Sequence, residues 1–281
     1  MTDMKVLLDT DIGNDIDDAV CLTYLLAQPE CELLGITTVT AGSLERARLA
    51  SALCMHAGRQ IPIRPGADRP LQREPLQEPP LSAEKLLARW PHHANFPQGE
   101  AVDFLRQTIL AYPGEVTLVA IGPLTNIARL FRADPAVVKQ LKSLVLMGGR
   151  YFTREDKPEW NIRNDPEAAQ VVFASPLPHL RAVGLDVTRQ VFLTAEEFRA
   201  RFTGLLLDFS GPWLAERDRV TFHDPLAAAT IFETFYGYQK GLVTIQPDGS
   251  TAFEPAVNGP HEVAKSVSPQ RFFNHYFTVV H

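Results

Sequence analysis

Five acidic side chains lie within ten residues near the start of the chain. The stretch runs from Asp9 to Asp18 and has the sequence DTDIGNDIDD, without a Lys or Arg. Carboxylates packed this closely repel one another unless a cation offsets their charge, and a divalent metal ion is the simplest such cation. Ligand sets made only of oxygen favour a hard ion, Ca²⁺ or Mg²⁺, over zinc. The stretch therefore predicts a metal or catalytic site.

Simpler explanations account for only part of this acidic stretch. Asp17 and Asp18 would be favourable charges in the first turn of a helix, and Asp9 would be a helix cap or turn residue. Each explanation covers one or two carboxylates but not five. An EF-hand loop is excluded because it needs glycine at its sixth position, whereas Gly13 is fifth when counted from Asp9.

His223, Asp224 and Pro225 precede an apolar segment, residues 226–232, that is predicted to be a helix. Asp224 as N-cap with Pro225 at the first helical position is an ordinary helix start, and taken alone it is the preferred interpretation. A helix N-terminus also presents an acid well, and histidine is suited to proton transfer near neutral pH.

Glu159, Trp160 and Asn161 end a polar insertion, and Asp165 is predicted to cap the next helix. In an extended segment the side chains of Glu159 and Asn161 would point the same way. Together they would offer hydrogen-bond acceptors and a donor to a polyol.

The elements that must position these residues alternate between short apolar strands and longer helices. Strands are predicted at residues 5–8, 32–40, 116–121, 144–147 and 180–185, and helices at 17–28 and 44–56. This pattern indicates an α/β fold, with an open, mostly parallel central sheet and helices on both faces. Ligands of such sheets bind beyond the carboxyl ends of the strands, so functional residues should lie just after strands.

The chain is predicted to form a single domain over residues 1–281. Two segments interrupt the alternation, one near 70–98 that is rich in Pro, Gln and Glu, and a polar one at 150–158. Long irregular segments inside a compact domain are usually functional lids or disordered, so we expect mobile loops at both places.

Composition excludes several classes of function. The chain is 45% hydrophobic, which is enough for a sizeable core, and its net charge is -6 without any run of Lys or Arg longer than a pair. This argues against nucleic-acid binding, which needs a positive field. No apolar stretch approaches the about 20 residues of a membrane span, and the start is too short and polar for a secretory signal. Three cysteines without metal-ligand spacing are expected to be reduced thiols, which predicts a cytoplasmic protein.

Taken in order, these motifs resemble the nucleoside hydrolase family of the inosine/uridine-preferring type. The first is similar to the family signature D-x-D-x-G-x-D-D-A, and the resemblance runs from about Lys5 to near Phe277. Several separated motifs in order are more specific than any single one. The later motifs are 34–39 (LGITTV), 121–128 (IGPLTNIA), 145–149 (VLMGG), 159–161 (EWN) with 165–169 (DPEAA), 183–188 (VGLDVT) and 223–225 (HDP).

The resemblance implies an enzyme of purine or pyrimidine salvage that hydrolyses the N-glycosidic bond of ribonucleosides with a tightly bound Ca²⁺. By this resemblance Asp11, Asp18 and Asp224 would be its side-chain ligands, and Ile121 would contribute a backbone carbonyl. Asp11 would also be the general base. His223 is the best candidate to stabilise the leaving base.

The resemblance also assigns the substrate contacts. Asp17 would hydrogen-bond the ribose 2'-hydroxyl, Glu159 the 5'-hydroxyl and Asn161 the ribose hydroxyls, while Trp160 would form a wall of the pocket. A small nucleoside would be the only partner apart from further copies of the chain, since relatives of this type are homodimers or homotetramers.

Several positions depart from the family pattern. The first motif contains two extra residues, Asn14 and Asp15, and Ile12 replaces proline. Residues 41–43 (AGS) replace a Gly-Asn pair, and an Asn upstream of Glu159 and a His-Gly lid motif have no clear counterpart. The metal site is thus intact while part of the nucleoside pocket differs, so the substrate remains open between purines, pyrimidines and a modified ribosyl compound.

Two other classes of protein compete with this interpretation. A haloacid dehalogenase-type phosphatase shares the beginning Asp9-Thr10-Asp11, but Gly13 stands where it has Thr or Val, and its later paired carboxylate is missing. A non-catalytic relative that binds a nucleoside or sugar would explain the altered pocket. The presence of both Asp11 and His223 argues against it, because binding alone does not require a base beside the metal.

Overall fold

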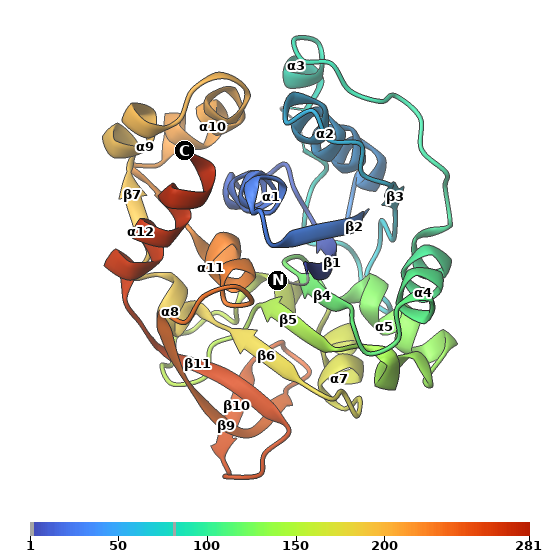
Figure 1. The fold of residues 1–281 in the computed structure, drawn as a ribbon. Coiled ribbons are helices and arrows are strands. Elements are labelled where there is room, and N and C mark those ends of the chain that lie inside the picture. The colour runs from blue at the N-terminus through green and yellow to red at the C-terminus, as the bar shows by residue number, and fades with distance from the viewer. Residues whose placement is uncertain (1–2, 81–82) are drawn as a thin grey trace.

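A nine-stranded sheet forms the centre of the computed structural model, which describes residues 3–80 and 83–281 (Figure 1). The strand order is β10-β9-β11-β6-β5-β4-β1-β2-β3. All neighbours from β11 to β3 pair in parallel, and β9 and β10 add an antiparallel edge. The strands are β1 (Met4–Thr10), β2 (Cys31–Thr38), β3 (Ile63–Pro65), β4 (Thr117–Ala120), β5 (Ser143–Met147), β6 (Leu180–Val183), β9 (Tyr236–Ile245), β10 (Thr251–Pro255) and β11 (His261–Val267), with β7 (Phe192–Thr194) and β8 (Arg219–Thr221) forming a separate pair.

Helices cover both faces of the sheet, as the sequence predicted. They are α1 (Asp17–Ala27), α2 (Ser43–His56), α3 (Ala83–Leu87), α4 (Ala101–Ala111), α5 (Thr125–Ala133), α6 (Trp160–Asn164), α7 (Pro166–Phe173), α8 (Leu185–Thr188), α9 (Ala195–Arg201), α10 (Gly204–Glu216), α11 (His223–Ala229) and α12 (Pro269–Val280), with a 3₁₀ turn at Val137–Gln140. No helix in the described part of the chain is long and apolar enough to cross a bilayer.

The core consists of two apolar layers, one on each face of the sheet. Successive residues of a strand point to opposite faces, so Val6 and Leu8 of β1 belong to the layer under α1, α2 and α12, while Leu7 belongs to the layer under α4, α5 and α7. The central strands are buried on both sides, which explains their near-continuous apolar sequences.

Several element boundaries differ from the predictions by one to three residues. The strand predicted at 180–185 ends at Val183, because Gly184 is the N-cap of α8. The helix predicted at 226–232 spans His223–Ala229 instead. The segment near 70–98 contains the short helix α3.

Two predicted features of side chains are confirmed. Asp165 caps α7 and accepts a hydrogen bond from the Ala168 amide at 3.0 Å. Cys21, Cys31 and Cys54 are buried free thiols.

Candidate metal centre and active site

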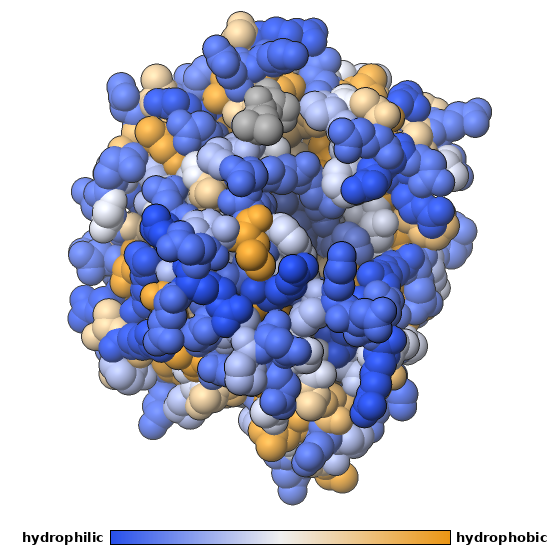
Figure 2. Space-filling model, turned by 180° about the vertical axis from the view of Figure 1, so that it is seen from behind, coloured by the Kyte–Doolittle hydropathy of each residue, from blue (hydrophilic) through white to orange (hydrophobic). Residues whose placement is uncertain are grey.

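A cavity of about 830 Å³ opens where β1, β4 and β5 end. Asp11 follows β1 directly, Ile121 follows β4, and Met147 is the last residue of β5, and all three line this cavity. It lies beyond the carboxyl ends of parallel strands, the place expected for a ligand site. The space-filling view shows a face that is hollowed near its centre, with mostly hydrophilic residues around the hollow (Figure 2). All nine predicted site residues line the cavity, namely Asp11, Asp17, Asp18, Ile121, Glu159, Trp160, Asn161, His223 and Asp224.

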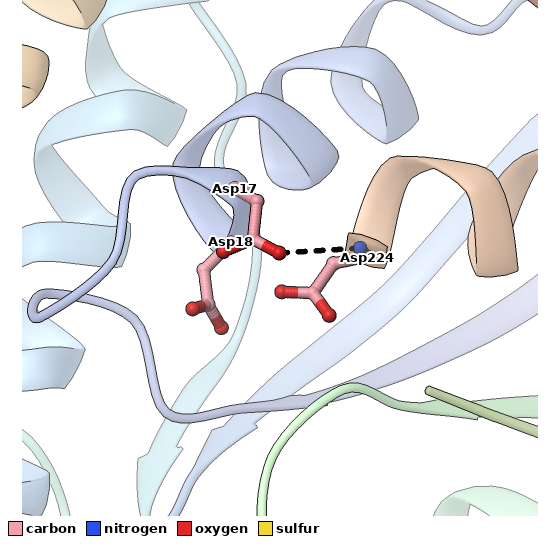
Figure 3. A group of neighbouring side chains, drawn as sticks. All are labelled: Asp17, Asp18 and Asp224. Carbon is pink, nitrogen blue, oxygen red and sulfur yellow. Dashed lines mark hydrogen bonds between the residues drawn. The ribbon is translucent and has the colours of Figure 1, made fainter. Parts of the chain in front are cut away.

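Three carboxylates, which we call the acidic trio, meet on one side of the cavity (Figure 3). Asp17 and Asp18 come from the first turn of α1, and Asp224 comes from the first turn of α11. One carboxylate oxygen from each lies within 4.8 Å of the others. A carboxylate oxygen of Asp17 accepts from the Asp224 amide at 3.4 Å, and Asp18 accepts from the Thr10 hydroxyl.

The acidic trio has the charge and the donor atoms to hold a metal ion. Burial raises the pKa of all three carboxyls well above the usual range, and repulsion among them raises it further. A divalent cation among them would favour the ionised forms and compensate for the lost hydration. The three donors are carboxylate oxygens, which suit a hard cation.

Asp224 does not act as the cap that the sequence predicted. The N-cap of α11 is Phe222, and no side chain caps this helix end. The carboxylate of Asp224 instead points toward Asp17 and Asp18 (Figure 3). The cap interpretation, preferred for this motif taken alone, is therefore wrong, and Asp224 faces the cavity as the family resemblance implies.

Asp11 lines the same cavity as the acidic trio. Among the residues that the structure describes, its carboxylate is not part of the group formed by Asp17, Asp18 and Asp224. Its carboxylate is close to Gly122, where an added Cβ would stand 2.8 Å from Asp11 Oδ1. The Ile121 carbonyl accepts from Asn161 Nδ2 at 2.9 Å. Two of the three carboxylates that the family resemblance implies as ligands, Asp18 and Asp224, are thus in the trio, and Asp17 is the third member.

Arg46 of α2 supplies a positive charge that the sequence reasoning missed. Its side chain is fully buried, and the charges of Asp11 and Asp18 attract it. The guanidinium connects the loop after β1 with the segment near 70–98. It donates to the carbonyls of Asp11, Ile12 (3.0 Å), Ala41 (3.0 Å) and Glu78 (3.1 Å) and to Asn14 Oδ1 (2.7 Å).

One sequence feature could have identified Arg46. It stands three and four positions before Leu49 and Ala50, which are both fully buried, so helical spacing places it on the apolar face of α2. A charged side chain on a buried helix face needs a partner of opposite charge. The carboxylates of the acidic stretch at residues 9–18 are candidates for that partner.

The two extra residues of the first motif join the wall of the cavity. Asn14 accepts from Arg46 at 2.7 Å and from Gln77 Nε2 at 3.1 Å. The half-buried Asp15 lines the cavity and accepts from the Ile16 amide at 2.6 Å. Burial raises the pKa of Asp15 to about 7.

Glu159 has an extended backbone, but Asn161 lies in helix α6, so the two residues do not alternate along one extended segment. Glu159 is the N-cap of α6, and its carboxylate accepts from the amides of Asn161, Ile162 and Gly149 at 2.8, 3.0 and 3.0 Å. A capping carboxylate replaces hydrogen bonds that a helix N-terminus lacks. Both predicted side chains are nevertheless buried and line the cavity, while Trp160 is 45% exposed.

His223 lines the cavity beside Asp224. Its Nδ1 lies 2.7 Å from the Thr188 hydroxyl. Burial lowers the pKa of His223 to about 4, and the positive charge of Arg189 contributes, so the imidazole is neutral at pH 7. When the Thr188 hydroxyl donates to Nδ1, the ring proton is on Nε2.

Asp9 supports the site from within the sheet and is neither a cap nor a turn residue. It lies in β1, fully buried, and accepts from the Thr37 hydroxyl and from Asn126 Nδ2 at 2.7 Å. Gly66 packs against Asn126, since a Cβ at Gly66 would stand 2.4 Å from its amide atoms. Burial raises the pKa of Asp9 to about 7.

Comparisons with known proteins agree with this geometry. The sequence profile described as "Inosine-uridine preferring nucleoside hydrolase" matches residues 6–274. Uridine nucleosidase 1 of Arabidopsis thaliana is 30% identical over 87% of this chain and 79% of its own length. Pyrimidine-specific ribonucleoside hydrolase RihB of Escherichia coli (strain SE11) is 36% identical over 70% of this chain and 64% of its own length. The structure of a purine-preferring ribonucleoside hydrolase from Gardnerella vaginalis superposes with a TM-score of 0.83 at 26% identity, covering 98% of each chain.

Proposed function

The chain belongs to the inosine-uridine preferring nucleoside hydrolase family and is an N-glycosyl hydrolase of ribonucleosides, and we propose that it works with Ca²⁺ bound at the acidic side of the cavity. The observation that carries this proposal is the acidic trio, buried beyond the carboxyl ends of the strands and lining the cavity. The products would be ribose and a free base.

The proposed ligands are the carboxylates of Asp18 and Asp224, the carboxylate of Asp11 and the backbone carbonyl of Ile121. All four residues line the cavity, and oxygen donors of these kinds are those that Ca²⁺ prefers. When bound, the ion would acidify a water and hold ribose hydroxyls. Asp17 is close enough to Asp18 and Asp224 to compete as a ligand, and we assign it to the ribose 2'-hydroxyl.

Asp11 would remove the proton from the attacking water as the bond between ribose and base breaks. Cleavage of a glycosidic bond passes through an oxocarbenium-like sugar, which the surrounding carboxylates stabilise by their negative charge. Two contacts would keep the Asp11 carboxylate in position for this role. The carboxylate lies close to Gly122, and Arg46 donates a hydrogen bond to the Asp11 backbone carbonyl.

Glu159 and Asn161 would position the ribose, and the half-exposed Trp160 would form a wall against the base. His223 is neutral, so it would stabilise the departing base by a hydrogen bond from Nε2–H rather than as an imidazolium. We propose that the altered pocket residues affect the choice of substrate rather than the metal side of the cavity.

Release of free ribose from uridine, cytidine, inosine and adenosine tests the reaction, measured with Ca²⁺ and again after exhaustive chelation. We expect ribose from at least one nucleoside, loss of release with the metal, and no turnover by Asp11→Asn. If none of these nucleosides releases ribose while calorimetry shows Ca²⁺ bound, they are not the substrates, and the protein acts on a modified ribosyl compound or is a binding relative.

The role of His223 needs a separate test with two leaving groups. His223→Ala should slow hydrolysis of uridine more than hydrolysis of 4-nitrophenyl riboside, because the nitrophenolate leaves without help. An equal loss on both substrates would contradict the role of His223 in leaving-group stabilisation. Thr188→Val, which removes only the hydroxyl near Nδ1, is the matched control and should reproduce part of the loss.

We further propose a cytoplasmic enzyme that forms a homodimer or homotetramer. The three buried free thiols fit a reducing compartment. The exposed side chains of Tyr238 and Leu242 on β9 would be covered by a second copy. Sedimentation velocity of the wild type and of Leu242→Glu tests the assembly; a monomeric wild type would exclude it.

We also propose one domain whose segments near 70–98 and at 150–158 order around the substrate. Both segments contribute residues to the cavity, including Gln77, Glu78 and Lys157. Limited proteolysis with and without ribose would show protection at both segments, and unchanged cleavage would contradict the motion.

A further inference from the structure

Five basic side chains line the same cavity as the acidic trio. They are Arg150, Lys157, Arg163, Arg189 and Arg217. Lys157, Arg189 and Arg217 are exposed, Arg163 is half-buried and Arg150 is buried, so four of the five lie nearer the solvent than the buried trio. The cavity therefore has an acidic floor and a basic mouth. We call these five residues the basic mouth.

The basic mouth is not a single charged run of the sequence. Arg150 and Lys157 lie in the insertion between β5 and α6, Arg163 lies in α6, and Arg189 and Arg217 directly follow α8 and α10. The whole chain carries 27 basic and 33 acidic residues, so a basic cluster runs against the average. Its convergence from four segments is a property of the fold.

Most of this positive charge has no partner within the protein. Glu155 is the shared partner of two members, Arg150 at 2.8 Å and Arg189. Lys157, Arg163 and Arg217 make no ion pair in the part of the chain that the structure describes. Glu78 and the half-buried Asp15 also line the cavity, and the charge of Arg217 acts on Asp15. Within the described residues, Lys157 and Arg163 are thus left free to meet a ligand, and Arg217 is held by no ion pair.

Two members of the basic mouth lie over tryptophan rings of the cavity wall. The Arg163 guanidinium carbon is 5.9 Å from the Trp160 ring centroid, and that of Arg217 is 5.3 Å from the Trp213 ring centroid. Trp160 and Trp213 both line the cavity. Each wall therefore presents an aromatic face suited to a base together with a guanidinium suited to phosphate or carboxylate.

A neutral nucleoside has no charge for the basic mouth to bind. The volume of about 830 Å³ lies in the upper part of the range of roughly 300–1,000 Å³ for small-molecule sites, which leaves room for an added group. The acidic floor would repel an anion that enters this cavity. The basic mouth would offset this repulsion if the anionic group of the substrate lies beside the basic side chains. The separation of charge thus fits a substrate that is neutral at one end and anionic at the other.

We infer that the preferred substrate is a ribonucleoside that carries an anionic group, phosphate or carboxylate, held at the basic mouth. This inference rests on the proposed function, in which the 2'- and 3'-hydroxyls face the metal side of the cavity. The anionic group is then on the 5'-carbon or on the base. The reaction is unchanged: water adds at C1', the C–N bond electrons leave with the base, and the anionic group takes no part.

Three pyrimidine ribosides separate the two positions of the charge. Uridine is the neutral reference, uridine 5'-monophosphate has the anion on the sugar, and orotidine (6-carboxyuridine) has it on the base. Inosine and its 5'-monophosphate repeat the comparison for a purine. We expect kcat/KM for one of the two anionic classes to exceed that of its neutral parent by about tenfold, as a few half-exposed charge pairs would give, and the advantage to shrink in high salt.

The variant Arg163→Gln with Arg217→Gln identifies the source of this preference. It removes the two guanidinium groups over the tryptophans and should lower the ratio of anionic to neutral kcat/KM toward one. Arg132→Gln is the matched control, because Arg132 is an exposed arginine of α5 outside the cavity and should leave the ratio unchanged.

The outcomes distinguish this inference from the proposed function. Hydrolysis of uridine or inosine with neither anion preferred overturns the inference and leaves the proposed function standing. An anionic preference that the double variant does not reduce also overturns it. Release of ribose or ribose 5-phosphate from none of the five compounds defeats both. Preference for a 5'-monophosphate assigns the anion to the sugar, and preference for orotidine assigns it to the base.

Discussion

Replacement of Arg46 tests how the protein tolerates its acidic cavity floor. Arg46→Met keeps an unbranched apolar side chain in place of the arginine stem but removes the charge and all five of the hydrogen bonds. Four of the acceptors are backbone carbonyls in the loop after β1, the loop between β2 and α2, and the segment near 70–98. Arg46→Lys keeps the charge but loses the planar fork that reaches several acceptors at once, so it is the matched control.

The size of the effect follows from the burial of Arg46. Single hydrogen bonds to a charged group contribute about 1.5–3 kcal/mol, but five bonds made by one group are not additive. Removing one partner of a buried charge interaction costs about 3–5 kcal/mol, which is the better guide for a fully buried guanidinium. We expect a loss of about 3–5 kcal/mol for Met and about half of that for Lys. Against a total stability of roughly 5–15 kcal/mol, the Met variant is folded but fragile.

Urea unfolding followed by circular dichroism measures this loss, in chelator and in excess Ca²⁺. The loss should be larger in chelator, because a bound cation takes over part of the offset that Arg46 gives to Asp11 and Asp18. A loss below about 1 kcal/mol for Arg46→Met in chelator would refute the reasoning, as would equal losses in chelator and Ca²⁺.

Three further outcomes follow from the cavity. Gly122→Ala places a Cβ 2.8 Å from both Asp11 Oδ1 and Val39 Cγ1, so we expect at least tenfold lower kcat together with a lower melting temperature, measured by ribose release and thermal unfolding. Gly66→Ala places a Cβ 2.4 Å from the Asn126 amide, which should lower stability in urea by about 1–3 kcal/mol through overpacking; an unaffected midpoint would contradict that packing. Asp224→Asn should weaken Ca²⁺ binding at least tenfold in calorimetry, and wild-type affinity would remove Asp224 from the ligand set.

Local sequence predicted the residues whose roles depend on their place after a strand. Asp11 and Ile121 lie directly after β1 and β4, and the apolar runs before them were long enough to identify both strands. The parallel sheet then brings these positions to the same cavity without any knowledge of distant contacts. Short-range patterns and one general rule of α/β sheets were sufficient to place Asp11 at such a site, whereas the role of Ile121 was implied by the family resemblance.

Residues whose roles depend on the rest of the structure were missed or misassigned. Arg46 is 28 positions after Asp18 and reaches the acidic stretch only because α2 packs beside that loop. The cap role of Glu159 was not predicted, because it depends on the three backbone amides from which its carboxylate accepts hydrogen bonds. The convergence of the basic mouth from four segments has no local signature at all.

The choice of N-cap at α11 shows why local rules fail at a functional site. Asp224 satisfies the sequence rule for a cap, and Pro225 satisfies the rule for the residue after it. The structure leaves this helix end without a side-chain cap and directs the Asp224 carboxylate to the acidic trio. A cap contributes about 1 kcal/mol, so giving one up for a metal ligand is a small loss.

Several features of the protein stabilise the buried carboxylates of the acidic floor when no metal ion is bound. Arg46 offsets the charge of Asp11 and Asp18, and the trio lies in the first turns of α1 and α11, where partial positive charge at helix ends favours carboxylates. Protonation of some members, which their raised pKa values permit, supplies the remainder when no cation is bound. Because these contributions belong to the protein itself, the floor can form before the metal arrives. Metal binding then requires the carboxyls of the trio to lose their protons, but it does not have to order the loop after β1. The affinity for the metal should therefore depend more on the ionisation of the trio than on folding of the chain around the metal.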